Sequence, residues 1–235
     1  MSSDLLELLG VRKQFGAYVV LNDVAFSVSA GEIVGLVGPN GSGKTTTINV
    51  ISGLLQADGG QVNFLGRNIN RLPMFKRAHA GINRTFQVPK VFRDMTVREN
   101  VEVAGRTVHL PDAEVERILR DIDLHKVAHR SAGSLTVNQQ KLLDLGRALA
   151  TRPRLLLVDE IGAGLNPAEL NVIATLLQKL AASGIALIVV EHLLDFLNRI
   201  TERVIVLGAG RMLFEGSLEV ASRDPEVVAA FIGAA

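Results

Sequence analysis

The chain has 235 residues, with 25 Lys and Arg against 24 Asp and Glu, a formal net charge of +1 and no cysteine. This length can bury a substantial core in one compact unit, and the lack of cysteine excludes disulfides, thiolate metal sites and cysteine nucleophiles. No run of like charge favours nucleic acid as a partner, and the longest apolar run, "IALIVV" at 185–190, is far shorter than the roughly 20 residues of a membrane span. We expect neither a secretion leader nor a transmembrane helix.

The first third predicts strands and one helix. In "DVAFSVS" at 23–29 apolar residues alternate with small or polar ones, which is typical of a half-buried strand. The continuous run "EIVGLVG" at 32–38 predicts a buried strand that leads into a glycine-rich loop. A helix over 45–55 and a short strand over 61–66 follow.

The remaining two thirds divide into a helical part and an alternating part. Residues of about 92–150 are predicted to be helical, with Val115, Ile118, Leu119 and Ile122 forming one apolar stripe after Pro111. From there strands and helices alternate: a strand at 154–160, a helix from Asn166 to Gly184, a strand at 185–190, a helix at 193–198, a hairpin at 203–216 that turns at 208–210, and a last helix opened by Asp224 and Pro225.

One motif predicts phosphate binding. "GPNGSGKT" at 38–45 matches G-x-x-x-x-G-K-[ST] and lies between a predicted strand and a predicted helix. Its glycines let backbone N–H groups surround phosphates, Lys44 reaches the outer phosphates, and the Thr45 hydroxyl can bind Mg²⁺. A glycine-rich turn without a ligand is the alternative. The predicted ATP-binding residues of this loop are Gly38, Pro39, Asn40, Gly41, Ser42, Gly43, Lys44, Thr45 and Thr46.

A pair of acids ends the predicted strand "LLLVDE". Asp159 can hold Mg²⁺ through its coordination shell, and Glu160 can orient and activate water. Two acids at a strand end could instead cap the segment that follows. A general base beside the γ-phosphate indicates hydrolysis rather than transfer to an acceptor, and the chain has no N-K-x-D guanine reader, so ATP hydrolysis is favoured.

Four further segments complete a resemblance. They are "RTFQ" at 84–87, "LTVNQQKLLDLGRALA" at 135–150, "AGLNP" at 163–167 and "VVEH" at 189–192. In this order they resemble the nucleotide-binding subunit of an ABC transporter over nearly the whole chain. With the ending "DPEVVAAFIG" they are most similar to the ATP-binding subunits of bacterial branched-chain amino-acid importers.

The resemblance implies the fold. This is the α/β P-loop NTPase fold of ABC type, with a RecA-like core, an N-terminal antiparallel β lobe and an inserted helical lobe. Residues 1–235 would form a single ABC ATP-binding domain, in which 1–87 and 151–235 supply the core and β lobe and about 88–150 the helical lobe.

The resemblance also implies site residues. Phe15 would stack on adenine beside Val20, Gln87 would contact Mg²⁺ and sense the γ-phosphate, and His192 would contact that phosphate. Glu160 would be the general base, with charge stabilised by Lys44 and His192 and with Mg²⁺ organised by Thr45, Gln87 and Asp159. The alternatives are that Phe15 packs in the core, Gln87 lies in a solvated loop and His192 serves only as a structural residue.

The family signature, usually L-S-G-G-Q, here reads Leu135, Thr136, Val137, Asn138, Gln139. In the family it opens a helix whose N-terminus faces the γ-phosphate bound by the opposite subunit. Thr136 keeps the hydroxyl and can form a capping box with Gln139. Asn138 puts a side chain in place of a glycine, and its amide either donates to phosphate or holds the subunits apart. An ordinary capped helix without a ligand is the third alternative.

Two smaller departures from the family pattern follow the catalytic acids. Ile161 stands where relatives commonly have proline, and Asn166 stands where many have aspartate, although asparagine is usual among the amino-acid importers.

The implied cofactors are ATP and Mg²⁺, and the implied partners form a transporter. They are a second ABC ATPase subunit (a homodimer or a related chain), two membrane permease subunits whose cytoplasmic helices enter a groove near 87–92, and an extracytoplasmic solute-binding protein. The chain would be peripheral, at the cytoplasmic face of the bacterial inner membrane.

Two alternative functions remain open. One is a non-transport ABC ATPase switch, which usually has two cassettes, a coiled-coil insertion or basic surfaces. The other is a regulatory subunit that binds ATP with little hydrolysis. Branched-chain amino acids, other amides and urea-like compounds all remain open as the solute.

Overall fold

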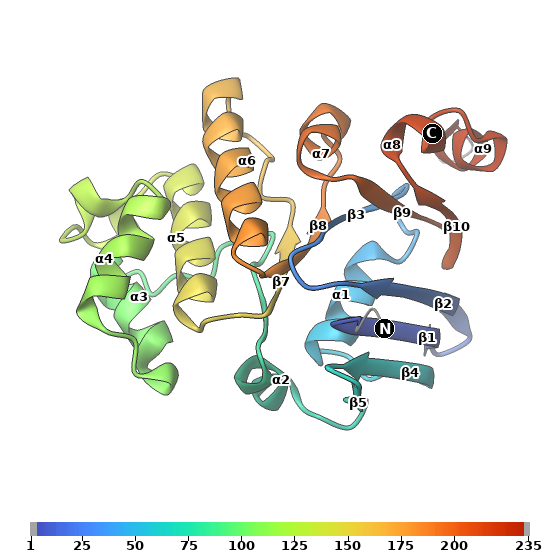
Figure 1. The fold of residues 1–235 in the computed structure, drawn as a ribbon, viewed down its shortest axis with the longest axis horizontal. Helices are drawn as coiled ribbons and strands as arrows, with labels where there is room; N and C mark the ends of the chain where they lie inside the picture. Colours follow the sequence, from blue (N-terminus) through green and yellow to red (C-terminus); the bar gives the residue numbers. More distant parts are fainter. Residues whose placement is uncertain (1–3, 233–235) are drawn as a thin grey trace.

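The computed structural model describes residues 4–232, which form two sheets and their covering helices (Figure 1). The smaller sheet is antiparallel and has the order β2-β1-β4-β5. Its strands are β1 (Leu6–Phe15), β2 (Tyr18–Val28), β4 (Gly59–Phe64) and β5 (Arg67–Asn68). It packs beside the larger sheet and forms the predicted N-terminal β lobe.

The larger sheet has the order β10-β9-β3-β8-β7-β6. Its strands are β3 (Ile33–Val37), β6 (Ile82–Arg84), β7 (Leu155–Asp159), β8 (Ala186–Val190), β9 (Arg203–Gly208) and β10 (Arg211–Gly216). β10 runs antiparallel to β9, whereas β9, β3, β8, β7 and β6 pair in parallel. The carboxyl ends of these parallel strands therefore share one edge of the sheet.

The central strands are apolar, apart from Asp159 at the end of β7, because both faces of the sheet are covered. All five residues of β3, β7 and β8 are buried. Successive side chains point to opposite faces, so Leu155 and Leu157 join the core on the side of the β lobe, whereas Leu156 and Val158 join the core on the side of α5 and α6. An apolar run without alternation is thus the pattern of a strand buried on both faces.

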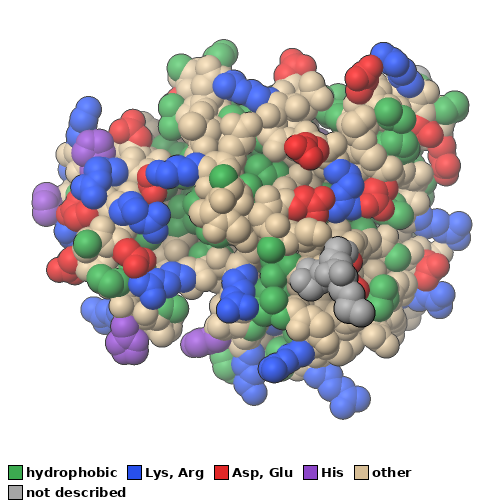
Figure 2. Space-filling model, in the orientation of Figure 1, with side chains coloured by type: hydrophobic (Ala, Val, Ile, Leu, Met, Phe, Trp, Pro, Cys, Tyr) green, Lys and Arg blue, Asp and Glu red, His purple; other side chains and the backbone are tan. Residues whose placement is uncertain are grey.

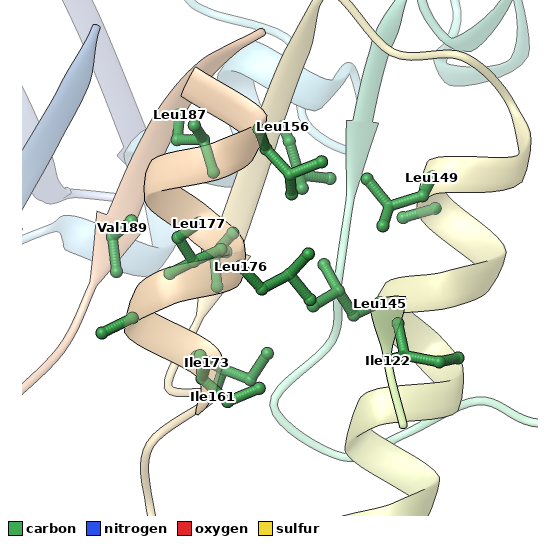
Figure 3. Packing of buried hydrophobic residues seen from close by; sticks show 14 of the residues in the cluster. Ile122, Leu145, Leu149, Leu156, Ile161, Ile173, Leu176, Leu177, Leu187 and Val189 are labelled. Carbon is green, nitrogen blue, oxygen red and sulfur yellow. The ribbon is translucent and has the colours of Figure 1, made fainter. Parts of the chain in front are cut away.

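Nine α-helices lie within the described residues: α1 (Lys44–Ser52), α2 (Met74–Ala80), α3 (Val97–Gly105), α4 (Asp112–Asp121), α5 (Val137–Ala150), α6 (Pro167–Ala182), α7 (Leu194–Ile200), α8 (Leu218–Ala221) and α9 (Pro225–Ile232). Helices α3, α4 and α5 group at one end of the molecule (Figure 1). Leu145 and Leu149 of α5 lie near Leu176 of α6 (Figure 3), and all three belong to one buried cluster. The helical lobe and the sheet therefore share a hydrophobic core.

The start of α6 follows from local chemistry. The side chain of Asn166 accepts hydrogen bonds from the N–H groups of Ala168 (2.9 Å) and Glu169 (3.0 Å), and the Glu169 carboxylate accepts one from the N–H of Asn166 (2.8 Å). Pro167 occupies the first helical turn, where its missing N–H costs nothing. The predicted helix after Asn166 is confirmed.

Most predicted elements are confirmed, one prediction is wrong, and some short elements were not predicted. The region of about 92–150 is not continuously helical, because it contains 3₁₀ turns at 106–108, 125–127 and 132–134 between its three α-helices. The sequence reading also missed α2 and β6, which are only seven and three residues long. Elements this short carry too few residues to display a hydrophobic period.

No helix within residues 4–232 is both long enough and apolar enough to cross a bilayer. Basic and acidic side chains are interspersed over much of the face in Figure 2, with basic side chains gathered along its lower edge.

Arg77 of α2 forms hydrogen bonds with α1, the helix that follows the phosphate loop. Its side chain is 1 % exposed, and its guanidinium donates to the backbone carbonyl oxygens of Val50 (2.7 Å), Ile51 (2.9 Å), Leu72 (2.9 Å) and Asn70 (3.1 Å). Burial lowers the pKa of Arg77 to about 10, so the group is still charged and a strong donor at neutral pH. It adds donors to carbonyl groups in the last turn of α1, where the helical hydrogen-bond ladder ends.

We expect Arg77→Leu to lower the free energy of unfolding by about 3 kcal/mol, because several buried carbonyl groups lose their donors. Urea unfolding followed by circular dichroism measures this change. Lys76→Leu, the same substitution at the exposed neighbouring position, should change the free energy by no more than about 0.5 kcal/mol. Equal effects of the two substitutions would contradict the assigned role.

Candidate nucleotide-binding site

The phosphate loop joins the end of β3 to the start of α1. Gly38 and Gly43 have φ values of 148° and 105°, and both are packed against neighbouring strands. A Cβ atom on Gly38 would lie 2.2 Å from the carbonyl oxygen of Leu207, and one on Gly43 would lie 2.6 Å from Cδ2 of Leu21. Neither position can carry a side chain without moving β9 or β2, so glycine is required here by both conformation and space.

The side chain of Lys44 lies inside the loop. Its Nζ donates to the carbonyl oxygens of Gly38 (2.7 Å) and Pro39 (3.0 Å), and the residue is buried. Desolvation lowers the pKa of Lys44, and the carboxylates of Glu160 and Asp159 oppose that shift. A partly desolvated ammonium group at this position suits an anionic ligand.

The start of α1 fits a phosphate group. Gly43 is its N-cap and supplies no side-chain acceptor, so no cap satisfies the first N–H groups of the helix. Next to it, the buried Oγ of Ser42 has no hydrogen-bond partner among the described residues. Thr45, in the first turn, is exposed. Free helical N–H groups, an unpartnered hydroxyl and an adjacent ammonium group are the chemistry that phosphate oxygens require.

Asp159 ends β7 at the same edge of the sheet. Its side chain is 6 % exposed and faces the guanidinium of Arg84, with Nη2 and Oδ2 3.5 Å apart. Desolvation raises the pKa of Asp159, whereas the charges of Arg84 and Lys44 lower it. A carboxylate oxygen here, with the Thr45 hydroxyl, belongs to the donor set that Mg²⁺ prefers when phosphate and water complete its shell.

Glu160 lies between Gln87 and His192. Nε2 of Gln87 donates to Oε2 of Glu160 at 2.7 Å, and Nε2 of His192 is 3.0 Å from Oε1. These three residues follow β7, β6 and β8, which are neighbours in the sheet. Glu160 also has a φ of 49°, a region that non-glycine residues rarely occupy. Adjacent parallel strands thus bring together residues that the sequence separates widely.

Phe15 and Val20 lie on the β1–β2 hairpin, apart from the group formed by Glu160, Gln87 and His192. Phe15 is 49 % exposed, so the alternative in which it packs in the core is wrong. The ammonium group of Lys13 is 5.4 Å from the centre of its ring. The carbonyl of Val20 is next to Gly43 in the phosphate loop, as the crowding around a Cβ at Gly43 indicates. An exposed aromatic ring near the loop is available to stack on a base.

The signature segment opens α5 as a capped helix. The Thr136 hydroxyl accepts from the N–H of Gln139 (3.2 Å), and the Gln139 side chain accepts from the N–H of Thr136 (3.1 Å), which confirms the predicted capping box. Leu135 is buried and Val137 is 65 % exposed. The Asn138 amide donates within its own chain, to the carbonyl oxygen of Gly164 (3.3 Å) and to the Glu169 carboxylate (3.4 Å).

Two residues that the sequence reading did not assign hold the segment after Glu160. Nζ of Lys141 donates to the carbonyl oxygens of Glu160 (3.1 Å) and Ala163 (2.6 Å). The buried Glu191 carboxylate accepts from the N–H groups of Gly162 and His192, and desolvation raises its pKa. Both lie inside segments quoted above, Glu191 in "VVEH" and Lys141 in "LTVNQQKLLDLGRALA", but only the folded structure shows what their side chains contact.

Ile161 has a structural explanation. It is 3 % exposed and belongs to the core on the α6 side of the sheet. Figure 3 shows its side chain beside Ile173 of α6. The position therefore contributes apolar burial beneath the site, in a place where the family resemblance leads one to expect proline.

Comparison with known proteins defines the class. The sequence pattern of the ABC transporter family matches residues 21–163, and the chain therefore belongs to this family of ATP-binding cassettes. It is 34 % identical, over the full length of both chains, to the high-affinity branched-chain amino acid transport ATP-binding protein BraF of Pseudomonas aeruginosa. It is 35 % identical, over 98 % of each chain, to the lipopolysaccharide export system ATP-binding protein LptB of Acidithiobacillus ferridurans. Among solved structures, the ADP conformation of MJ1267, an ATP-binding cassette of an ABC transporter, is similar with a TM-score of 0.88 and 34 % identity, covering 98 % of this chain and 99 % of that one.

The capping role of Thr136 is testable by two matched substitutions. Thr136→Val keeps the shape of the side chain but removes the acceptor, and we expect it to lower the free energy of unfolding by about 1 kcal/mol. Thr136→Ser retains the cap and should change it by no more than about 0.3 kcal/mol. Urea unfolding gives both values, and a valine variant as stable as the serine variant would show that the cap contributes nothing.

Proposed function

We propose that this chain is the ATP-binding and ATP-hydrolysing subunit of an importer, and that it powers the uptake of branched-chain or related amino acids through separate membrane permease subunits. The main supporting observation is that Glu160, Gln87 and His192 converge at the carboxyl edge of the parallel sheet. Asp159 lies at the same edge, and the phosphate loop begins there. This arrangement supports hydrolysis, because an oriented carboxylate is what activation of water requires.

Binding of the nucleotide is assigned to the loop and the hairpin. The backbone of Gly38–Thr46 and the ammonium group of Lys44 hold the phosphates, and Phe15 stacks on the base with Val20 beside it. Thr45, Gln87 and Asp159 would hold Mg²⁺, which when bound neutralises phosphate charge and polarises the bond that breaks. The free N–H groups of α1 and the unpartnered Ser42 hydroxyl support this assignment.

Hydrolysis is assigned to Glu160 as the general base. Its two carboxylate oxygens are held by different side chains, one by Gln87 and one by His192, so the group has a defined orientation before water is activated. Lys44 and His192 stabilise the charge that develops on the γ-phosphate. Gln87 connects this group to the segment that leads into the helical lobe.

A second subunit completes each site. Leu135, Thr136, Val137, Asn138 and Gln139 present the start of α5 to ATP bound by the partner, which is a second copy of this chain or a related cassette. ATP binding across the interface shifts the population from open to closed dimers, and the helical lobe at about 88–150 moves with that closure. Two permease subunits receive the movement at the groove near residues 87–92.

The relatives support the proposed cellular setting. Branched-chain amino acid transport proteins that the chain matches over its full length support a peripheral position at the cytoplasmic face of the bacterial inner membrane, with an extracytoplasmic solute-binding protein in the complete system. The similarity to LptB, named for lipopolysaccharide export, is of the same degree. Assignment of the solute class therefore rests on the importer relatives, and uptake measured with reconstituted permeases would test it.

Glu160→Gln tests the catalytic assignment. We expect ATP hydrolysis to fall at least about 100-fold, because the general base is lost, while ATP binding persists. Phosphate release gives the rate. Light scattering with Mg-ATP should then show a mass that rises from about 25 kDa, the mass of one chain, to about 50 kDa as the closed dimer accumulates.

Glu202→Gln is the matched control, since this exposed carboxylate lies just before β9, at the opposite end of the parallel strands. It should hydrolyse ATP at the wild-type rate. A Glu160→Gln protein that is equally fast would contradict the role of Glu160. A wild-type protein that binds ATP but releases no phosphate would instead favour the regulatory alternative.

Asn138 is expected to oppose dimer closure, because its amide is engaged by Gly164 and Glu169 of its own chain. In the Glu160→Gln background we expect Asn138→Gly to lower the chain concentration for half-dimerisation about tenfold, since the start of α5 is then free for the partner's phosphate. Asn138→Asp, of equal size, should raise it, because a carboxylate there repels both Glu169 and phosphate. Light scattering at several concentrations measures both, and a glycine variant that dimerises no better than its parent would exclude this role.

A further inference from the structure

Arg84 connects three parts of the molecule and has no role in the mechanism above. Its side chain is 5 % exposed, at the end of the edge strand β6. Nη1 donates to Oδ1 of Asn49 on α1 at 2.6 Å, and Nη2 is 3.5 Å from Oδ2 of Asp159 on β7. The centre of the guanidinium also lies 4.7 Å from the centre of the Phe86 ring. One planar group thus touches the phosphate-loop helix, the proposed magnesium ligand and an aromatic ring.

Phe86 and Arg84 also line a cavity between the lobes. The cavity has a volume of about 190 Å³ and separates α2 and β6 on one side from α3 and α5 on the other. Other lining residues are Met74, Ala78, Asp144 and Arg147. The backbone N–H of Phe86 donates to the Asp144 carboxylate on α5 at 3.0 Å. Arg84 therefore reaches from a surface between the lobes to a carboxylate inside the nucleotide site.

The geometry requires a guanidinium rather than any positive charge. Arginine presents several N–H donors in a rigid plane, so it can contact Asn49 and Asp159 with different nitrogens while its face remains on Phe86. A lysine carries the same charge on a single flexible nitrogen and cannot hold all three partners in one arrangement. In a buried setting the attraction between Arg84 and Asp159 is screened little by water, so the position of one group constrains the other.

We propose that Arg84 is a positioning residue that fixes the Asp159 carboxylate for Mg²⁺ and couples the magnesium site to the cavity between the lobes. This inference rests on the proposed function, because it takes Asp159 as a magnesium ligand. A group that fills the cavity displaces Phe86 or the face of Arg84, and the same guanidinium carries that displacement to Asp159 and α1. Binding of Mg-ATP acts in the reverse direction.

The chain contains a matched control in the same cavity. Arg147 pairs with Asp144 at 3.3 Å, and its guanidinium stacks on Phe92 at 4.6 Å from the ring centre. Like Arg84, Arg147 therefore has a carboxylate partner, contacts an aromatic ring and lines the cavity. Within the part of the chain that the structure describes, its side chain contacts Asp144, Lys90 and Phe92 but neither α1 nor β7.

The first experiment compares Arg84→Lys with Arg147→Lys in the complete chain. A fluorescent ATP analogue is titrated into each protein with Mg²⁺ and with EDTA, and thermal unfolding is recorded. Mg²⁺ should strengthen binding of the analogue, and we expect this gain in affinity to be about tenfold smaller in Arg84→Lys than in the wild type. Changes to residues that support a metal ligand commonly have an effect of this size. The affinity measured in EDTA should change by no more than about twofold. Arg147→Lys should keep the full gain.

A second variant protects the test against misfolding. Asn49→Ala removes the closer of two contacts between Arg84 and α1 and leaves only the longer one to the Ser52 hydroxyl at 3.4 Å; Asn49 is partly exposed, so the fold should persist. It should reduce the Mg²⁺-dependent gain in the same direction as Arg84→Lys. If the Arg84→Lys or the Asn49→Ala protein keeps the whole gain in affinity from Mg²⁺, the role of Arg84 is overturned while the proposed function stands. A wild-type protein that binds no ATP would overturn the proposed function, and the inference with it.

The coupling to the cavity is tested by thiol labelling. The chain has no cysteine, so Ala78→Cys places a single reporter on the cavity wall formed by α2. We expect Mg-ATP to change the labelling rate at least about threefold in the otherwise wild-type chain and to leave it unchanged when Arg84→Lys is added. The same change in both proteins would show that coupling bypasses Arg84.

Discussion

The site depends on the side-by-side order of four parallel strands, β3, β8, β7 and β6, whose carboxyl ends share one edge of the sheet. The phosphate loop leaves β3, His192 follows β8, Asp159 and Glu160 end β7, and Gln87 follows β6. Gln87 and Glu160 are 73 residues apart in the chain, yet Nε2 of Gln87 lies 2.7 Å from Oε2 of Glu160. Ligands of open α/β sheets bind at this edge because the loops converge there and the strands hold them rigidly.

The second requirement is electrostatic. Asp159, Asp144 and Glu191 are buried carboxyl groups, and desolvation raises the pKa of each. Every one of them has compensating partners: Arg84 and Lys44 for Asp159, Arg147 and the N–H of Phe86 for Asp144, and backbone N–H groups for Glu191. Buried ion pairs add little net stability, because desolvation offsets their attraction. Their contribution here is geometry, since each pairing holds a carboxylate in a fixed position relative to a neighbouring loop or strand.

The segment after Glu160 connects the end of β7 to helix α5. Lys141 and Asn138, both on α5, donate to carbonyl oxygens between Glu160 and Gly164. The same helix begins with the signature residues, which in the proposed dimer act on the partner's ATP. A movement of α5 therefore reaches the backbone of Glu160 directly. The shared hydrophobic core of α5 and α6 makes this connection stiff, because close-packed side chains transmit displacement.

The sequence by itself determined those features whose physical cause is local. The phosphate loop is eight contiguous residues, the capping boxes at Thr136 and Asn166 each span four, and the buried strands are unbroken apolar runs. The family resemblance added Gln87 and His192 as candidates but could not show what they contact. The tertiary structure alone decided that both hold Glu160, that Asn138 bonds to its own chain, and that Arg84 joins Asp159 to Asn49. It also revealed α2 and β6, which are too short to show a period. These contacts join segments tens of residues apart, and only the order of the strands and the packing of the helices bring such segments together.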